Sequence, residues 1–140
     1  MPRVRKKTVE EYIELIYTLE KRDGHAHTGA IASDMRIKPP SVTEMLQKLE
    51  KEGLVIYQSY SGANLTARGE VMARKLMEKH RVFEEFLGMI GIEKKIAERE
   101  ACQIEHHVNT KTARQLEKFV HYLKKKNDDE HWLDQFRELR

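Results

Sequence analysis

The stretch TGAIASDMRIKPPSVTEMLQKLEKEGLVIYQSYSGANLT, residues 28–66, gives the clearest indication of the fold of this chain. Thr28 is positioned to cap a short helix over about residues 28–35. Lys38-Pro39-Pro40 then predicts a break, because the residue before a proline avoids the helical region. Pro40 and Ser41 suit the start of a second helix that ends near Gly53. Its buried stripe is expected to comprise Val42, Met45, Leu46 and Leu49.

Two strand-like runs follow, at residues 54–60 and 63–65, with Ser61-Gly62 as the turn between them. This order of elements is typical of a winged helix-turn-helix, in which the second helix enters the major groove and the hairpin lies over the phosphates. The candidate DNA-contacting residues are Pro40, Ser41, Thr43, Glu44, Gln47 and Lys48 on the helix and Tyr60 on the hairpin. A small helical domain with a hairpin, or a winged fold used for protein contacts, would have the same pattern.

The rest of the chain is expected to be helical. One helix precedes this stretch, at about residues 8–22, and four follow it, at about 67–88, 93–108, 110–125 and 129–139. The fold class is therefore mainly α, with a winged helix-turn-helix domain over 1–70 and a helical metal-binding and dimerisation domain over 71–140. The last helix offers Trp132, Leu133 and Phe136 for packing.

Composition excludes several other classes of protein. With 35% charged and 39% hydrophobic residues, and no long apolar run, we expect a globular protein without a membrane partner. A single cysteine and the absence of an export signal favour a cytoplasmic location. The formal net charge of +3 is weak evidence for a nucleic-acid partner. A short basic arm that could contact phosphates, or merely solubilise the terminus, comprises Arg3, Arg5, Lys6 and Lys7.

Potential metal ligands recur at helical spacing. Cys102, Glu105 and His106 stand at i, i+3 and i+4, so one helix would present all three on one face. A thiolate, a carboxylate and an imidazole together suit a transition metal. Glu98 extends this stripe by one turn, and two further pairs at helical spacing are His80 with Glu84 and Glu11 with Glu14. Each pair could also be an ordinary surface pair of a charged helix.

Five ordered segments resemble the diphtheria-toxin-repressor family, which includes iron-dependent regulators and shorter manganese transport regulators. They are Glu11–Tyr17, Pro40–Thr43, Leu65–Gly69, His80–Glu84 and Ala101–His106. The resemblance implies a winged DNA-binding domain and a helical dimerisation domain, in the short form without an SH3-like domain. It also implies a primary metal site of Glu11, Cys102, Glu105 and His106, an ancillary site of His80, Glu84 and Glu98, and a manganese-type ligand at Glu14.

The ligand set departs from both branches of that family. Iron-type members typically have methionine at the position of Glu11 and histidine at that of Glu98, and manganese-type members have glutamate at that of Cys102. The thiolate favours Fe(II) over Mn(II), whereas the extra carboxylates favour harder ions, and Zn(II) or other divalent ions could bind in vitro.

We therefore expect a metal-dependent transcriptional repressor, with iron favoured and manganese as the alternative, that binds double-stranded operator DNA as a homodimer without an organic cofactor. Two other classes stay open. One is a winged-helix regulator that responds to a small organic ligand, and the other is a hydrolytic metalloenzyme.

Overall fold

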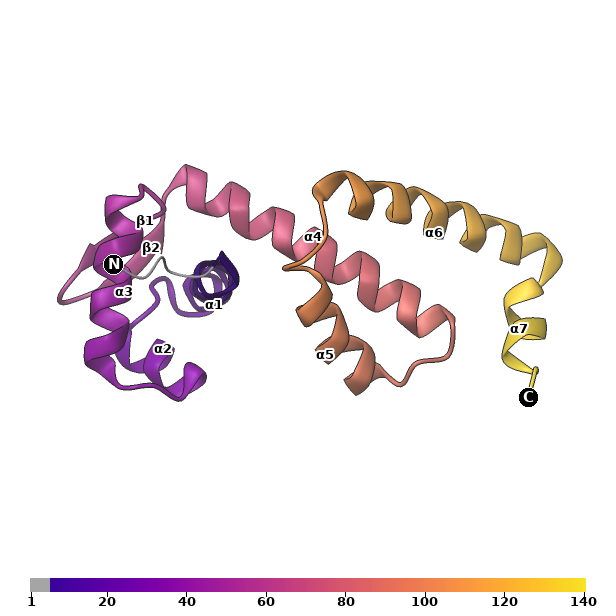
Figure 1. The fold of residues 1–140 in the computed structure, drawn as a ribbon, viewed down its shortest axis with the longest axis horizontal. Helices are drawn as coiled ribbons and strands as arrows, with labels where there is room; N and C mark the ends of the chain where they lie inside the picture. The colour runs from indigo at the N-terminus through magenta and orange to yellow at the C-terminus, as the bar shows by residue number, and fades with distance from the viewer. Residues whose placement is uncertain (1–5) are drawn as a thin grey trace. The chain divides into compact units, whose positions relative to one another are not determined.

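The structure, a computed structural model, describes residues 6–140, which form seven helices and one two-stranded sheet (Figure 1). The elements are α1 (Lys6–Asp23), α2 (Thr28–Met35), α3 (Pro39–Lys51), β1 (Val55–Gln58), β2 (Gly62–Leu65), α4 (Ala67–Met89), α5 (Lys94–Ile104), α6 (Thr110–Glu130) and α7 (Trp132–Arg137). The chain divides into two compact units, Met1–Arg74 and Lys75–Arg140, so α4 begins in the first unit and continues in the second.

The predicted helix–break–helix is present in the first unit. α2 ends at Arg36, which adopts the left-handed conformation (φ 57°) and donates its amide to the carbonyl of Ser33. α3 begins one residue earlier than predicted, because Pro39 occupies the first helical position, where a missing amide costs nothing. The expected cap at Thr28 is wrong: Thr28 is already helical, and His27 precedes it without a side-chain capping bond.

α3 packs on the core of the first unit with the predicted apolar stripe. Val42, Leu46 and Leu49 are at most 1% exposed and belong to one buried cluster with Ile13 and Ile16 of α1. Burial of this stripe orients the remaining faces of α3 outward. The helix can therefore present its polar residues to a partner without loss of core packing.

β1 and β2 form an antiparallel hairpin, which we call the wing. Tyr57 pairs with Ala63, and Ala63 also forms a β-bridge with Ala26 on its other side. Gly62 permits this close approach, since a Cβ at its position would lie 2.4 Å from the carbonyl oxygen of Ala26. The wing is thus attached to the chain between α1 and α2 as well as to its own two strands.

The second unit consists of most of α4 together with α5, α6 and α7. Asn109 caps α6 by accepting a hydrogen bond from the amide of Lys111 at 2.9 Å. α6 continues to Glu130, five residues beyond the predicted end, because the lysines at 124–126 favour helix and nothing interrupts it before the left-handed His131. α7 is correspondingly shorter than predicted, and Leu133 is its buried residue.

None of the helices that the structure describes is both long and apolar enough to cross a membrane. The mainly helical fold class and the small winged sheet that the sequence predicted are confirmed.

Candidate functional sites

His80 of α4 is held between two carboxylates in the second unit. Its Nε2 lies 2.9 Å from Oε2 of Glu84, one turn later on the same helix, and its Nδ1 lies 3.0 Å from Oε2 of Glu105. Two such contacts fix the orientation of the imidazole ring, as carboxylates commonly do for histidines that bind metals.

Glu105 is the most deeply buried charged residue of this group, at 0% exposure. Its second oxygen, Oε1, lies 3.5 Å from Nε2 of His106, which is also buried. The sequence placed Cys102, Glu105 and His106 on one continuous helix, and this is wrong in detail. α5 ends at Ile104, with Glu105 as its C-cap and His106 in the following turn.

Within the second unit, His80, Cys102 and Glu105 each offer one ligand atom, and these atoms lie within 4.8 Å of one another. The donors are an imidazole nitrogen, a thiol sulfur and a carboxylate oxygen from α4 and the end of α5. This mixed set fits a divalent first-row transition ion better than magnesium or calcium, which take oxygen ligands almost exclusively.

Glu98, Glu11 and Glu14 complete the set of ligands predicted from the sequence. Glu98 is exposed on α5, as Cys102 is, and its place in an ancillary site with His80 and Glu84 stays a prediction. Glu11 and Glu14 lie on α1 of the first unit, where Glu11 is 3.9 Å from Lys7. One oxygen of Glu14 is buried and has no hydrogen-bond partner among the described residues.

Lys79 is a residue near these ligands that the sequence analysis missed. Its Nζ donates a 2.8 Å hydrogen bond to the carbonyl of Val108, in the turn that follows His106. The contact ties this turn to α4 beside His80. No spacing rule could have found it, because the partner is a backbone oxygen 29 residues away.

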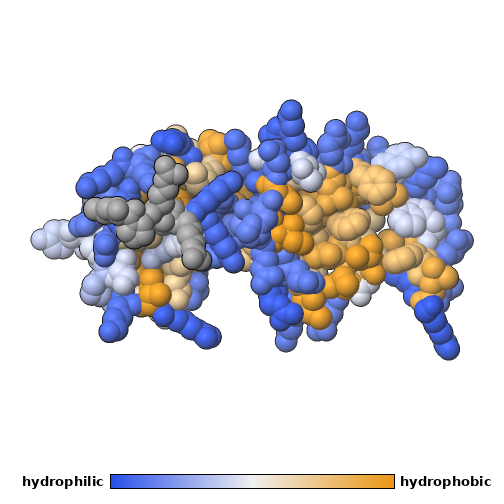
Figure 2. Space-filling view, viewed as in Figure 1, coloured by the Kyte–Doolittle hydropathy of each residue, from blue (hydrophilic) through white to orange (hydrophobic). Residues whose placement is uncertain are grey.

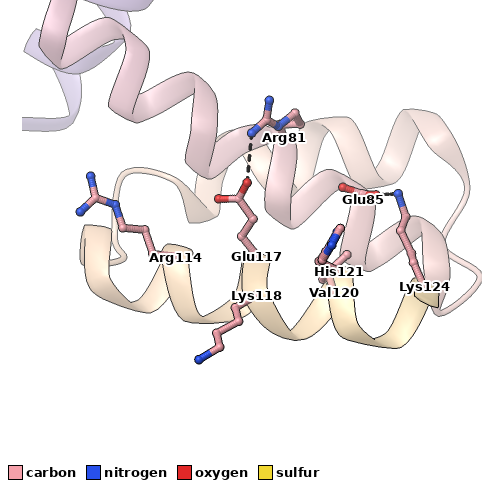
Figure 3. A pocket seen from close by; sticks show the side chains of 8 residues that line it. All are labelled: Arg81, Glu85, Arg114, Glu117, Lys118, Val120, His121 and Lys124. Atoms are coloured by element: carbon pink, nitrogen blue, oxygen red, sulfur yellow. Dashed lines mark hydrogen bonds and ion pairs between the residues drawn. The ribbon is translucent and has the colours of Figure 1, made fainter. Parts of the chain in front are cut away.

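A groove of about 460 Å³ lies between α4 and α6, and charged side chains line it (Figure 3). Arg81 pairs with Glu117 at 3.4 Å, and Lys124 pairs with Glu85, so both pairs join α6 to α4. The other lining residues are Arg114, Lys118, Val120 and His121. Because cations outnumber carboxylates here, this groove does not suit a metal ion.

The polar face of α3 carries the predicted DNA-contacting residues. Pro40, Ser41, Glu44 and Gln47 are exposed, whereas Thr43 and Lys48 are partly buried. Thr43 donates its hydroxyl to the carbonyl of Pro39 at 3.3 Å, and Glu44 lies 3.7 Å from Lys48. The acidic Glu44 is therefore partly neutralised on a surface that would face phosphates.

Tyr60 at the tip of the wing is fully exposed. Lys6 and Lys7 of the predicted basic arm form the start of α1 and lie 3.8 Å and 3.9 Å from Glu10 and Glu11, and their contact with phosphates stays a prediction. Arg3 and Arg5 lie outside the described residues.

Comparison with known families agrees with both units. Residues 6–63 match the model described as "Iron dependent repressor, N-terminal DNA binding domain", and residues 66–133 match "Iron dependent repressor, metal binding and dimerisation domain". The chain belongs to the iron-dependent repressor family of metal-dependent transcriptional regulators.

Individual relatives include transcriptional regulators and a protein described as a manganese regulator. The HTH-type transcriptional regulator MntR of Lysinibacillus sphaericus is 34% identical over 121 residues, which cover 86% of this chain and 87% of that protein. The structure of the manganese regulator SloR has a TM-score of 0.70 and 35% identity, over 81% of this chain and 54% of that one. ScaR with bound Zn²⁺ has a TM-score of 0.69 and 32% identity, over 81% and 54%. This chain thus spans about half the length of these two solved chains.

These findings confirm the resemblance inferred from the five segments. The chain is a transcriptional regulator with a DNA-binding and a dimerisation domain, not an enzyme, so the hydrolytic alternative is dropped. A divalent metal as its ligand is likewise supported. The preference for iron receives no support from these relatives.

Proposed function

We propose that this protein is a manganese-responsive repressor that binds operator DNA as a homodimer when a divalent cation occupies the site around His80, Cys102 and Glu105. The observation that carries the proposal is the convergence of these three donor atoms within 4.8 Å in the dimerisation unit. The preference for manganese over the iron that Cys102 alone suggests draws on the names of the relatives at 34–35% identity.

The residues that we assign to the metal in the second unit are His80, Glu84, Cys102, Glu105 and His106, and Glu11 and Glu14 of the first unit stay predicted ligands. Glu84 and His106 are included because they contact His80 and Glu105, whereas only its helical spacing supports Glu98, which is left out. When bound, a divalent ion supplies positive charge that balances the negative charge of the carboxylate ligands. Glu105 contacts His80 and lies beside His106. One carboxylate oxygen of Glu105 could bind the ion in place of its contact with the imidazole of His80.

α3 is the proposed recognition helix, and the wing is the proposed phosphate-contacting element. Exposed Ser41 and Gln47 can form hydrogen bonds with base edges, and Pro40 can contact a thymine methyl group. In a homodimer the two recognition helices would need a spacing of about 34–36 Å, or a multiple of it, to enter successive major grooves. Since DNA is the target, the cytoplasm is the proposed location.

The direct test is fluorescence anisotropy with a duplex selected from a random-sequence pool. It is performed anaerobically with chelator, Mn(II), Fe(II) or Zn(II). We expect Mn(II) to raise DNA affinity about a hundredfold, which corresponds to ~2.7 kcal/mol of coupling. Equal affinity with chelator and with every metal would contradict the metal switch. A clearly larger response to Fe(II) than to Mn(II) would contradict the preference for manganese.

Substitution of Cys102 tests the origin of metal selectivity. Cys102→Glu replaces the soft thiolate with a hard carboxylate, so the ratio of the Mn(II) to the Zn(II) response should rise about tenfold. The matched control is Gln103→Glu, which adds the same charge at the next, exposed position of α5. An equal change in both variants would mean that charge, and not ligation, sets selectivity. A repressor that responds to a small organic ligand would show neither change.

A further inference from the structure

The wing is too small to be stable as an isolated hairpin. Each strand has four residues, and an isolated two-stranded hairpin is only marginally stable in water. The contacts that the wing makes with neighbouring helices must therefore determine where its tip lies. Val55 and Ala63 pack the base of the wing into the core, and hydrogen bonds at the outer edges of the two strands add to this attachment.

β2 is attached to α1 and the chain that follows it. The amide of Leu65 donates to Oε2 of Glu20 at 3.2 Å, and Nδ2 of Asn64 donates to the carbonyl of Gly24 at 2.9 Å. Ala63 exchanges two 2.9 Å backbone hydrogen bonds with Ala26. This edge of the wing is consequently fixed to the body of the first unit.

β1 is attached to α3 by a different contact. The amide of Tyr57 donates to Oε2 of Glu50 at 2.9 Å. Tyr57 is paired with Ala63, whose own amide points away from β1 toward Ala26, so the amide of Tyr57 also lies on an outer edge. Glu50 follows the buried Leu49, so its backbone is fixed by the core while its carboxylate reaches the strand.

We propose that Glu50 is a positioning residue that sets the distance between the wing and α3, and thereby allows both to contact one DNA duplex. The proposal rests on the DNA-contacting roles proposed above for α3 and the wing. Glu50 joins these two elements directly and need not touch DNA itself. The hydrogen bond between Glu50 and Tyr57 lies at the surface. When the carboxylate of Glu50 is removed, water can therefore accept the hydrogen bond from the amide of Tyr57. The unit should then stay folded while the wing becomes less ordered.

The test compares three variants in DNA binding with Mn(II) present. Glu50→Ala removes the hydrogen bond, Glu50→Gln keeps an oxygen acceptor without the charge, and Glu52→Ala removes the same charge from the exposed end of α3. Relative to Glu52→Ala, we expect Glu50→Ala to bind about tenfold more weakly. Glu50→Gln should bind within about twofold of the Glu52→Ala variant.

Hydroxyl-radical footprinting separates positioning from general loss of structure. Glu50→Ala should lose protection at the phosphates under the wing and keep it at the groove that α3 occupies. Equal loss of both footprints, equal affinity of Glu50→Ala and Glu52→Ala, or failure of Glu50→Gln to restore binding would each overturn the proposal.

Amide hydrogen exchange tests the contact without DNA. The amide of Tyr57 should exchange at least tenfold faster in Glu50→Ala than in the wild-type protein or in Glu50→Gln. Failure of the wild-type protein to bind any duplex would count against the proposed function. Unchanged Tyr57 exchange in Glu50→Ala would instead count against the role of Glu50 in particular.

Discussion

The two units of the chain bury their hydrophobic residues to very different extents. Fourteen buried residues of the first unit form one cluster, whereas the corresponding cluster of the second unit has three, Met89, Val120 and Leu133. Of the ten exposed large hydrophobic residues in the described chain, seven lie after Arg74. On the face shown in Figure 2, hydrophobic side chains gather over α4 and the neighbouring parts of α5 and α6.

This difference indicates what each unit needs in order to be stable. The first unit encloses its core by itself, as a DNA-reading module must if its recognition surface is to stay fixed. The second unit leaves apolar surface uncovered and buries the carboxylate of Glu105 beside other candidate metal ligands. A second copy of the chain and a metal ion are the partners that would complete it.

The largest effect is expected from the core of the first unit. Leu46→Ala removes a fully buried side chain and should cost about 2–5 kcal/mol of unfolding free energy, measured by urea denaturation. Leu133→Ala in the smaller cluster of the second unit should cost less, and Leu139→Ala, at 74% exposure, almost nothing. A greater loss in Leu133→Ala than in Leu46→Ala would contradict the contrast between the two units.

Metal binding should depend on the buried carboxylate of the second unit. Glu105→Gln keeps the size of the side chain but removes the charge beside His80, so the Mn(II) affinity should fall about a hundredfold, or ~2.7 kcal/mol. Isothermal titration calorimetry would measure this. Glu100→Gln, at an exposed position of α5, is the control and should leave the affinity unchanged.

Dimerisation should be sensitive to the exposed hydrophobic residues of the second unit. Ile90→Ser and Phe119→Ser are expected to weaken self-association, with at least one of them raising the dimer dissociation constant about tenfold, or ~1.4 kcal/mol. Sedimentation equilibrium would report it. The control is Ile56→Ser, which changes an exposed residue of the first unit. An equal effect of Ile56→Ser on the dimer dissociation constant would contradict the contrast between the two units.

The smallest effect concerns the contact between α7 and α6. Nε1 of Trp132 donates a 3.1 Å hydrogen bond to the carbonyl of Leu123. Trp132→Phe keeps an aromatic ring but loses this bond, and should cost about 0.5–1.5 kcal/mol in thermal denaturation. A loss above about 3 kcal/mol would mean that α7 is a larger part of the core than its burial indicates.

Much of the fold could be predicted from local patterns. The break before Pro39, the apolar stripe of α3 and the presence of a hairpin follow from proline geometry and from the periods of helix and strand. The predicted turn at Ser61-Gly62 is wrong in position, because Gly62 pairs with Gln58 in β2 and the turn comprises residues 59–61. The ends of helices were less predictable. α6 continues past its run of lysines because no residue there interrupts a helix, and its end coincides with the conformation of His131.

The candidate metal site was predictable in its residue types but not in its contacts. Helical spacing singled out His80 and the Cys102–His106 segment, and it gave Glu98 the same status, which stays a prediction. The contact of His80 with Glu105 joins residues 25 positions apart, so it depends on the packing of two helices and not on the spacing within either.

The sequence by itself determined the winged helix-turn-helix, the helical second unit and the kinds of metal ligand, because these follow from local periodicity and side-chain chemistry. Only the tertiary structure decided that α5 ends before Glu105, that Glu105 is buried beside His80, and that Glu50 holds the edge of the wing. Each of these depends on how elements distant in sequence pack together. A carboxylate can contact a residue far away in the sequence only when the fold brings the two backbone segments close to each other.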